Sequence, residues 1–181
     1  LFVGRLVPEN CAHHIVDAFR QLDTDLKCVI VGDAAYAEEY IASLKARAAN
    51  DPRIVFTGYV FGKGYHELGS NAHIFVESSG VGGTHPALTE AMAFGNCVVV
   101  NDTPENLETI GEAGLGYNGR LGADSLKQIL QELIASPAKV DQYKHMAQTR
   151  AQSCYSWESV TDSYERLFYQ ICHQPFPKHL S

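Results

Sequence analysis

The residues best suited to chemistry lie between positions 77 and 100, where a glycine-rich turn separates two apolar runs. The turn leads to Pro86, which fits the first turn of a helix because its missing N–H needs no helical partner. Glycine lets the backbone approach a ligand closely, and the first N–H groups of a helix favour an anion. The stretch therefore predicts an anion-binding site, although a tight strand-to-helix turn without a ligand also fits this loop.

Two further sets of residues, the paired histidines and the cysteines, are of types that can carry chemistry. His13 and His14 are consecutive in a predicted helix, so we expect that they do not share a face and that both are structural. The five cysteines are odd in number and scattered, which favours reduced structural thiols in a cytosolic protein over a zinc site.

The size and charge of the chain narrow the function classes. A length of 181 residues suits one domain, and 45% hydrophobic with 19% charged residues is typical of a soluble globular protein. A net charge of −7 without a basic cluster argues against a nucleic-acid partner. No apolar run approaches the ~20 residues of a transmembrane helix. The chain begins inside an expected strand and without a starting Met, so we expect it to be a piece of a longer protein.

Strand and helix patterns alternate along the chain, and this alternation predicts a Rossmann-like, doubly wound α/β fold. We expect a mostly parallel six-stranded sheet with helices on both faces. The strands are expected at 1–3, 27–31, 53–56, 73–76, 97–100 and 115–117. The first helix is expected to follow Asn10 and to run through Ile15 to Leu22, and the others are expected at 36–49, 65–69, 86–95, 105–110, 123–135, 140–154 and 156–172.

Ligands of such sheets bind at the carboxyl ends of the strands. The predicted site therefore includes the loop from Ser78 to His85 together with the loops that follow the neighbouring strands. Trp157 and Tyr164 are expected to pack the last helix onto the domain, and residues 175–181 are expected to fray.

Several motifs together resemble glycosyltransferase family 4. They are Phe-Val-Gly-Arg-Leu at 2–6, Val-Gly-Asp at 31–33, Val-Phe-Thr-Gly-Tyr-Val at 55–60, the stretch from 79 to 95, and Tyr-Ser-Trp-Glu at 155–158. The resemblance covers the C-terminal, donor-binding half of the GT-B architecture. It implies that residues 1–174 form the nucleotide-sugar-binding domain, that the N-terminal acceptor domain is absent, and that the fragment alone is inactive.

The resemblance also assigns roles to residues. It implies that Arg5, beside Gly4, holds the donor diphosphate, although an ordinary surface arginine is the alternative. Glu90 corresponds to the family glutamate that bonds the ribose hydroxyls, and we count Arg5 and Glu90 as catalytic. The other expected diphosphate-binding positions are Asn10, Gly82, Gly83, Thr84, His85, Pro86, Ala87 and Leu88.

Two of these positions depart from the family pattern. Gly82 stands where the first glutamate of a pair is expected, and Asn10 stands where a lysine is expected. Both departures resemble a rhamnosyltransferase-like subgroup. His85 either bonds a phosphate or sugar hydroxyl or caps its own turn. We expect Gly32 and Tyr59 at the nucleoside, while an exposed loop tyrosine is the alternative for Tyr59.

The start of the short helix at 105–110 adds one more candidate. Glu108 matches an acidic family residue, with helix capping as the competing role.

The implied activity is the donor half of a retaining transferase in bacterial-type polysaccharide synthesis, acting on a glycan or lipid-linked acceptor. The expected partners are a nucleotide-sugar of unknown base and the acceptor domain, and no cofactor or metal is expected. The expected location is cytoplasmic, peripheral at the inner face of the membrane through the absent domain. A GT-B-shaped sugar-nucleotide epimerase and a non-catalytic nucleotide-binding module remain alternatives.

Overall fold

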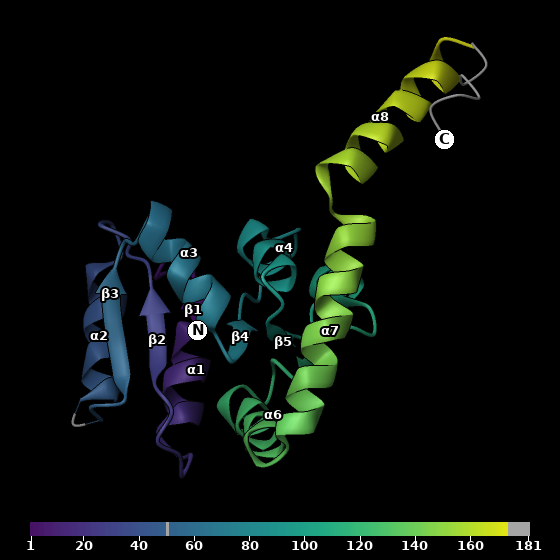
Figure 1. The fold of residues 1–181 in the computed structure, drawn as a ribbon. Helices are drawn as coiled ribbons and strands as arrows, with labels where there is room; N and C mark the ends of the chain where they lie inside the picture. The colour runs from purple at the N-terminus through teal and green to yellow at the C-terminus, as the bar shows by residue number, and fades with distance from the viewer. Residues whose placement is uncertain (50, 174–181) are drawn as a thin grey trace.

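A computed structural model describes residues 1–49 and 51–173 (Figure 1). The strands are β1 Phe2–Val3, β2 Cys28–Val31, β3 Ile54–Gly58, β4 Ile74–Glu77, β5 Cys97–Asn101 and β6 Leu115–Tyr117. A short 3-10 helix, η1 Pro8–Asn10, precedes α1 Ala12–Phe19. The remaining helices are α2 Glu38–Ala48, α3 Gly62–Asn71, α4 Pro86–Ala93, α5 Pro104–Ile110, α6 Ala123–Ala135, α7 Pro137–Cys154 and α8 Trp157–Ile171.

The strands form two parallel ladders, β1-β2-β3 and β4-β5-β6. Leu1 joins the two ladders, because its amino group donates to the Ile74 carbonyl at 2.8 Å and its carbonyl accepts from the Val76 N–H at 2.9 Å. The combined order is β3-β2-β1-β4-β5-β6, and the direction of winding reverses between β1 and β4. The doubly wound, parallel fold predicted from the sequence is confirmed, and ligands of such sheets bind at this reversal.

The two faces of the sheet carry separate apolar cores, as the alternation of side chains along a strand requires. On β5, Val99 packs in the core with α1 and α6, whereas Val98 and Val100 pack in the core with α4 and α7. Helices therefore cover both faces of the sheet, and the carboxyl ends of the strands stay open between them.

The last helix does not follow the prediction. Trp157 is 84% exposed, Tyr164 is 59% exposed, and α8 has no buried residue. Figure 1 shows α8 projecting beyond the end of α7, away from the sheet. The expectation that Trp157 and Tyr164 return this helix to the domain is wrong, because the apolar face of α8 has no surface of the described chain to pack against.

The first turn of α1 also differs from the prediction. The rings of His13 and His14 lie 4.5 Å apart at their centroids, and both are half-buried. Adjacent helix positions differ by only about 100°, so two long side chains can still converge when each ring has an anchor. Tyr40 anchors His13 and Tyr117 anchors His14. The expectation that His13 and His14 cannot share a face of the helix is therefore wrong.

Some boundaries shift as well. Helix α2 begins at Glu38, so Tyr36 lies in the preceding turn and is exposed, while α3 is longer than expected. The predicted tail at 175–181 lies outside the described residues. Within the described part of the chain, no helix has both the length and the apolar character needed to cross a bilayer.

Candidate functional site

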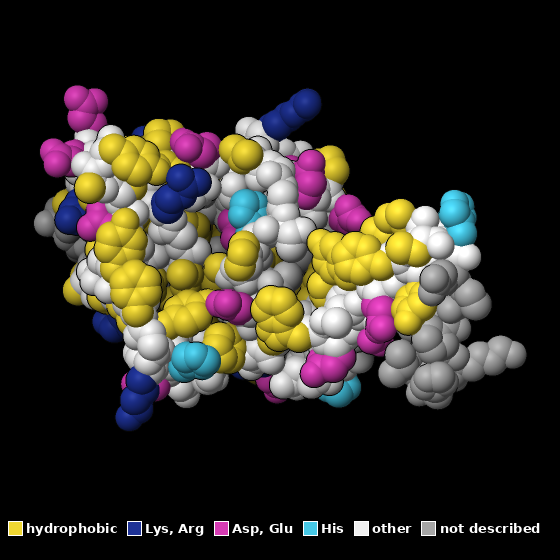
Figure 2. All heavy atoms as spheres, turned by 90° about the horizontal axis from the view of Figure 1, so that it is seen from above, with side chains coloured by type: hydrophobic (Ala, Val, Ile, Leu, Met, Phe, Trp, Pro, Cys, Tyr) yellow, Lys and Arg dark blue, Asp and Glu magenta, His cyan; other side chains and the backbone are white. Residues whose placement is uncertain are grey.

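A cavity of about 440 Å³ opens where β1 and β4 end side by side. β2 points upward in Figure 1, so the view from above in Figure 2 looks onto this edge, where basic, acidic, histidine and hydrophobic side chains meet. The cavity brings together seven of the predicted site residues: Gly4, Arg5, Asn10, Gly82, His85, Pro86 and Ala87. Segments that lie about 80 positions apart in the chain thus form one concave site.

A second cavity, of about 320 Å³, is lined mainly by apolar residues such as Leu1, Phe19 and Leu130. It lies beside the amino end of β1 rather than at the carboxyl edge. An apolar lining offers little to hold a charged ligand. The first cavity, lined by Arg5 and the glycine-rich loop and called here the carboxyl-edge cavity, is therefore the better candidate for an anion.

Arg5 provides the main cationic group of the carboxyl-edge cavity. Its side chain is exposed, and Nη1 donates to the Tyr36 hydroxyl at 3.1 Å. The Asn10 amide donates to the Arg5 carbonyl at 2.8 Å, so Asn10 fixes the loop that carries the guanidinium. Asn10 supplies no charge where a lysine is expected, but it holds the backbone of the residue that does.

Hydrogen bonds from buried asparagine side chains hold the glycine-rich loop in place. Asn101 donates to the Ser78 carbonyl at 3.1 Å, and Asn106 donates to the Ser79 carbonyl at 3.3 Å and to the Asn101 carbonyl at 3.1 Å. The Gly80 N–H donates to the Glu9 carbonyl at 2.9 Å, which ties the loop to η1. Buried hydrogen bonds of this kind hold an irregular segment without regular structure.

Helix α4 begins at the rim of the cavity. Pro86 occupies its first turn, as predicted, and His85 is the residue at its N-cap. The His85 ring lies 3.2 Å from the Val81 carbonyl, which matches the turn-capping alternative, yet His85 also lines the cavity. Gly83 and Thr84 are exposed in the loop that joins Gly82 to His85. Leu88 is fully buried in the core, and its N–H donates to the His85 carbonyl, so it does not line the cavity.

Glu77 is a cavity residue that the sequence reasoning missed. It is only 4% exposed at the end of β4, and its carboxylate accepts from the Ser79 N–H at 3.0 Å. Burial raises the pKa of Glu77, and His85 partly opposes this shift. The available signal was an acidic residue directly after the apolar run Ile74–Val76, because a charged group there must have a reason to be buried.

Gly82 lies against an acidic side chain from another segment. A side chain at position 82 would collide with the Glu105 carboxylate, which lies at the start of α5. Glu108, the predicted acidic candidate, is exposed and does not line the cavity, and its carbonyl accepts a hydrogen bond from Arg150 at 2.7 Å. Of the two glutamates, Glu105 is therefore the one that adjoins the glycine-rich loop.

The predicted nucleoside residues lie outside the cavity. Tyr59 is 59% exposed after β3, its hydroxyl donates to the Asp33 carbonyl, and its ring stacks on Phe61 with centroids 5.8 Å apart. Gly32 is buried, and a Cβ there would overlap the Gly4 carbonyl, so close backbone approach accounts for this glycine. Phe61, 80% exposed, had no sequence signal beyond its aromatic type.

Glu90 lies on α4 and faces α3 rather than the cavity. Its carboxylate accepts a hydrogen bond from the Tyr65 hydroxyl at 2.5 Å. Burial raises the pKa of Tyr65, and the Glu90 carboxylate raises it further. The structure thus pairs Glu90 with Tyr65, and Glu90 does not line the cavity that Arg5 lines.

Comparison with known proteins relates this chain to sugar transferases. The sequence model described as glycosyl transferases group 1 matches residues 1–152. Alpha-maltose-1-phosphate synthase of Mycobacterium tuberculosis is 24% identical over 95% of this chain and 48% of its own length. An uncharacterized glycosyltransferase of Methanocaldococcus jannaschii is 27% identical over 94% of this chain and 44% of its own. The chain thus spans about half the length of the curated relatives it matches.

Solved structures show the same fold. The Anabaena protein HepE, crystallised with UDP, superposes with a TM-score of 0.84 at 19% identity, over 93% of this chain and 48% of that one. The C-terminal domain of a group 1 glycosyl transferase, LpcC from Francisella tularensis, gives a TM-score of 0.74 at 18% identity, over 86% of this chain and 85% of that domain. With the fold shared and the family model matching most of its length, this chain belongs to the glycosyl transferases group 1 family.

Proposed function

We propose that this chain is the donor-binding half of a retaining glycosyltransferase that takes a sugar from a nucleotide-sugar. The observation that carries the proposal is the carboxyl-edge cavity, where Arg5, the glycine-rich loop and the start of α4 converge. HepE and LpcC support the assignment, because one is described in complex with UDP and the other as a C-terminal domain of this family. Residues 1–174 are the donor domain in this proposal, and the acceptor half lies elsewhere in a longer protein.

The proposed chemistry is stabilisation of the departing nucleoside diphosphate. Negative charge grows on this leaving group as the bond to the sugar breaks, so fixed donors aimed at it lower the barrier. Arg5 is permanently charged and can bond two phosphate oxygens at once. The backbone N–H groups of Gly83 and Thr84 and the first turn of α4 add positive potential. Because protein groups supply this potential, we propose that the transfer itself needs no metal at the diphosphate.

The nucleoside is proposed to extend from the cavity towards β3. Tyr59 and Phe61 offer an exposed stacked pair for a base, and the Glu90 carboxylate is an acceptor suited to ribose hydroxyls. Glu77 lines the cavity, and we propose that its carboxyl group contacts a sugar hydroxyl. We propose a glycan or lipid-linked acceptor in polysaccharide synthesis, and the motifs at 8–10 and 82–85 suit a rhamnosyltransferase-like donor domain.

Calorimetry with UDP, GDP, dTDP and ADP tests the proposal. We expect one of these diphosphates to bind and Arg5→Ala to weaken it at least about tenfold, equivalent to about 1.4 kcal/mol. The matched control is Arg20→Ala, since Arg20 is also an exposed arginine but follows the far end of α1. Unchanged affinity in Arg5→Ala, or an equal loss in Arg20→Ala, removes Arg5 from the site.

Chelator and acceptor experiments complete the test. Nucleotide affinity is expected to persist in excess EDTA, whereas a loss of binding would overturn the metal-independent part of the proposal. A longer protein that contains this chain should transfer sugar to an acceptor. Conversion of the donor sugar without any acceptor would instead indicate an epimerase, and nucleotide binding without either reaction would indicate a non-catalytic module.

A further inference from the structure

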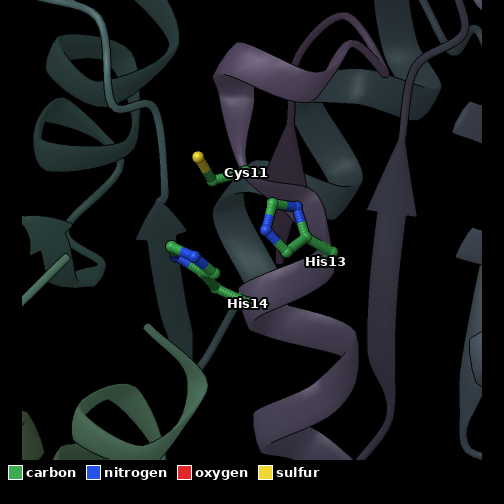
Figure 3. A group of neighbouring side chains, drawn as sticks. All are labelled: Cys11, His13 and His14. Carbon is green, nitrogen blue, oxygen red and sulfur yellow. The ribbon is translucent and has the colours of Figure 1, made fainter. Parts of the chain in front are cut away.

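We propose that Cys11, His13 and His14 form a transition-metal site of the zinc class, with one thiolate and two imidazole ligands. One candidate ligand atom from each residue lies within 4.8 Å of the other two. Figure 3 shows the thiol and the two rings grouped around the first turn of α1. All three residues are half-buried, so an ion could be enclosed on one side and reached from the other.

The backbone at the start of α1 makes this grouping possible. Cys11 is the N-cap residue and has a left-handed conformation with φ of 50°. Non-glycine residues seldom adopt this conformation, so the surrounding structure must hold it in place. The thiol of Cys11 thereby stays beside the two rings that follow it, although the three residues are nearly consecutive in the chain.

Each imidazole ring already has a partner that fixes its orientation. His13 Nδ1 lies 3.0 Å from the Tyr40 hydroxyl, and His14 Nδ1 lies 3.1 Å from the Tyr117 hydroxyl. These two contacts restrain the planes of the imidazole rings. The two tyrosines come from α2 and β6 regions of the same core, and Tyr117 is fully buried. The rings are therefore positioned before any ion arrives.

The donor set selects the class of ion. A thiolate with imidazoles suits zinc and related borderline-soft ions rather than magnesium or calcium, which prefer oxygen ligands. Zinc bond lengths near 2.0–2.3 Å imply ligand atoms roughly 3.3–3.6 Å apart in a tetrahedral site, so the group must contract by about 1 Å. On binding, the Cys11 thiol gives its proton to the solvent and no oxidation state changes. A water molecule or a substrate group would fill the fourth position.

This site is separate from the proposed diphosphate contacts but adjoins them. The Glu9 carbonyl accepts from the Cys11 thiol at 3.5 Å and from the Gly80 N–H at 2.9 Å. Glu9 also lines the carboxyl-edge cavity. The ion would thus lie next to the loops that shape the cavity. Zinc binding can be tested without nucleotide, so the metal site can be refuted independently of the proposed nucleotide site.

Zinc titration of the 181-residue chain by calorimetry tests the proposal, with Co²⁺ as a spectroscopic probe. We expect one equivalent of Zn²⁺ to bind, and we expect Co²⁺ to give the near-ultraviolet absorption of a cobalt–thiolate bond. Cys11→Ser, His13→Asn and His14→Asn should each weaken zinc binding at least tenfold. Cys154→Ser and His145→Asn change an exposed cysteine and an exposed histidine of α7 and should leave it unchanged. Equal zinc affinity in Cys11→Ser and the parent chain overturns the site.

A second measurement needs no variant, so it does not depend on whether a variant folds. Iodoacetamide alkylation followed by mass spectrometry should show Cys11 protected by Zn²⁺. The exposed Cys154 and Cys172 of the same molecule serve as internal controls and should react equally with and without the ion. Alkylation of Cys11 at the same rate with and without Zn²⁺, or equal protection of Cys154, overturns the proposal.

Discussion

Helices α7 and α8 follow one another in the chain but have opposite relations to the rest of the molecule. Helix α7 buries Val140, Ala147 and Ala151 against both cores, and Arg150 donates to the Glu108 and Thr109 carbonyls near the end of α5. Helix α8 buries none of its residues, although it separates apolar from polar positions more cleanly than α7 does. Amphipathic spacing therefore identifies a helix and its apolar face, but not whether the same chain supplies a surface for that face.

The largest expected difference comes from truncating one leucine in the packed body of the molecule and one leucine on α8. Leu126→Ala on α6 should lower the free energy of unfolding by about 2–5 kcal/mol, because Leu126 is completely buried in the core with α1. Leu167→Ala on α8, the same chemical change, should alter it by no more than about 0.5 kcal/mol. Urea denaturation measures both. A loss of 2 kcal/mol or more in Leu167→Ala would mean that α8 packs onto the body in solution.

A smaller loss of unfolding free energy is expected for a substitution that tests whether the glycine-rich loop is held as firmly as the packed body of the molecule. Asn106→Ala removes two donated hydrogen bonds and leaves the Ser79 and Asn101 carbonyls without this partner, so it should destabilise by about 1–3 kcal/mol. The control is Asn71→Ala, where an exposed amide bonds only within its own helix. Equal effects of the two substitutions on the urea midpoint would place the loop with α8 as a loosely held segment.

The smallest effect concerns the contact between the loop and α5. Gly82→Glu restores the family glutamate but places it against the Glu105 carboxylate, so we expect a loss of about 1 kcal/mol from crowding and like charge. Glu105→Ala in the same chain should recover most of that loss. A double-mutant cycle on unfolding free energy measures this coupling. Additive effects would show that the two positions do not meet.

Periodicity was enough to predict most of the elements. The run at 97–100 and the helix at 123–135 appear where their apolar spacing placed them, because local pattern and burial agree there. Tyr36 was misplaced because apolar spacing continued through the turn before α2. The cavity residues around Arg5 were predicted from motifs, and the structure brings seven of them together.

What the sequence could not show depends on contacts between distant segments. The meeting of Glu105 with Gly82, and of His14 with Tyr117, depends on how loops and strands pack in three dimensions. Phe61 beside Tyr59 follows from the path of the chain after β3 rather than from any spacing rule. The exposure of α8 likewise depends on surfaces beyond its own pattern.

The exposure of Trp157 has a practical consequence for spectroscopy. It is the single tryptophan of the chain and is 84% exposed on the projecting helix. Its emission in the native protein should already resemble indole in water, so tryptophan fluorescence will barely change when the sheet is denatured. The same exposure makes Trp157 a selective reporter of α8. A blue shift of its emission, or protection from acrylamide quenching, would show that another surface has packed onto this helix, because the rest of the chain contains no tryptophan.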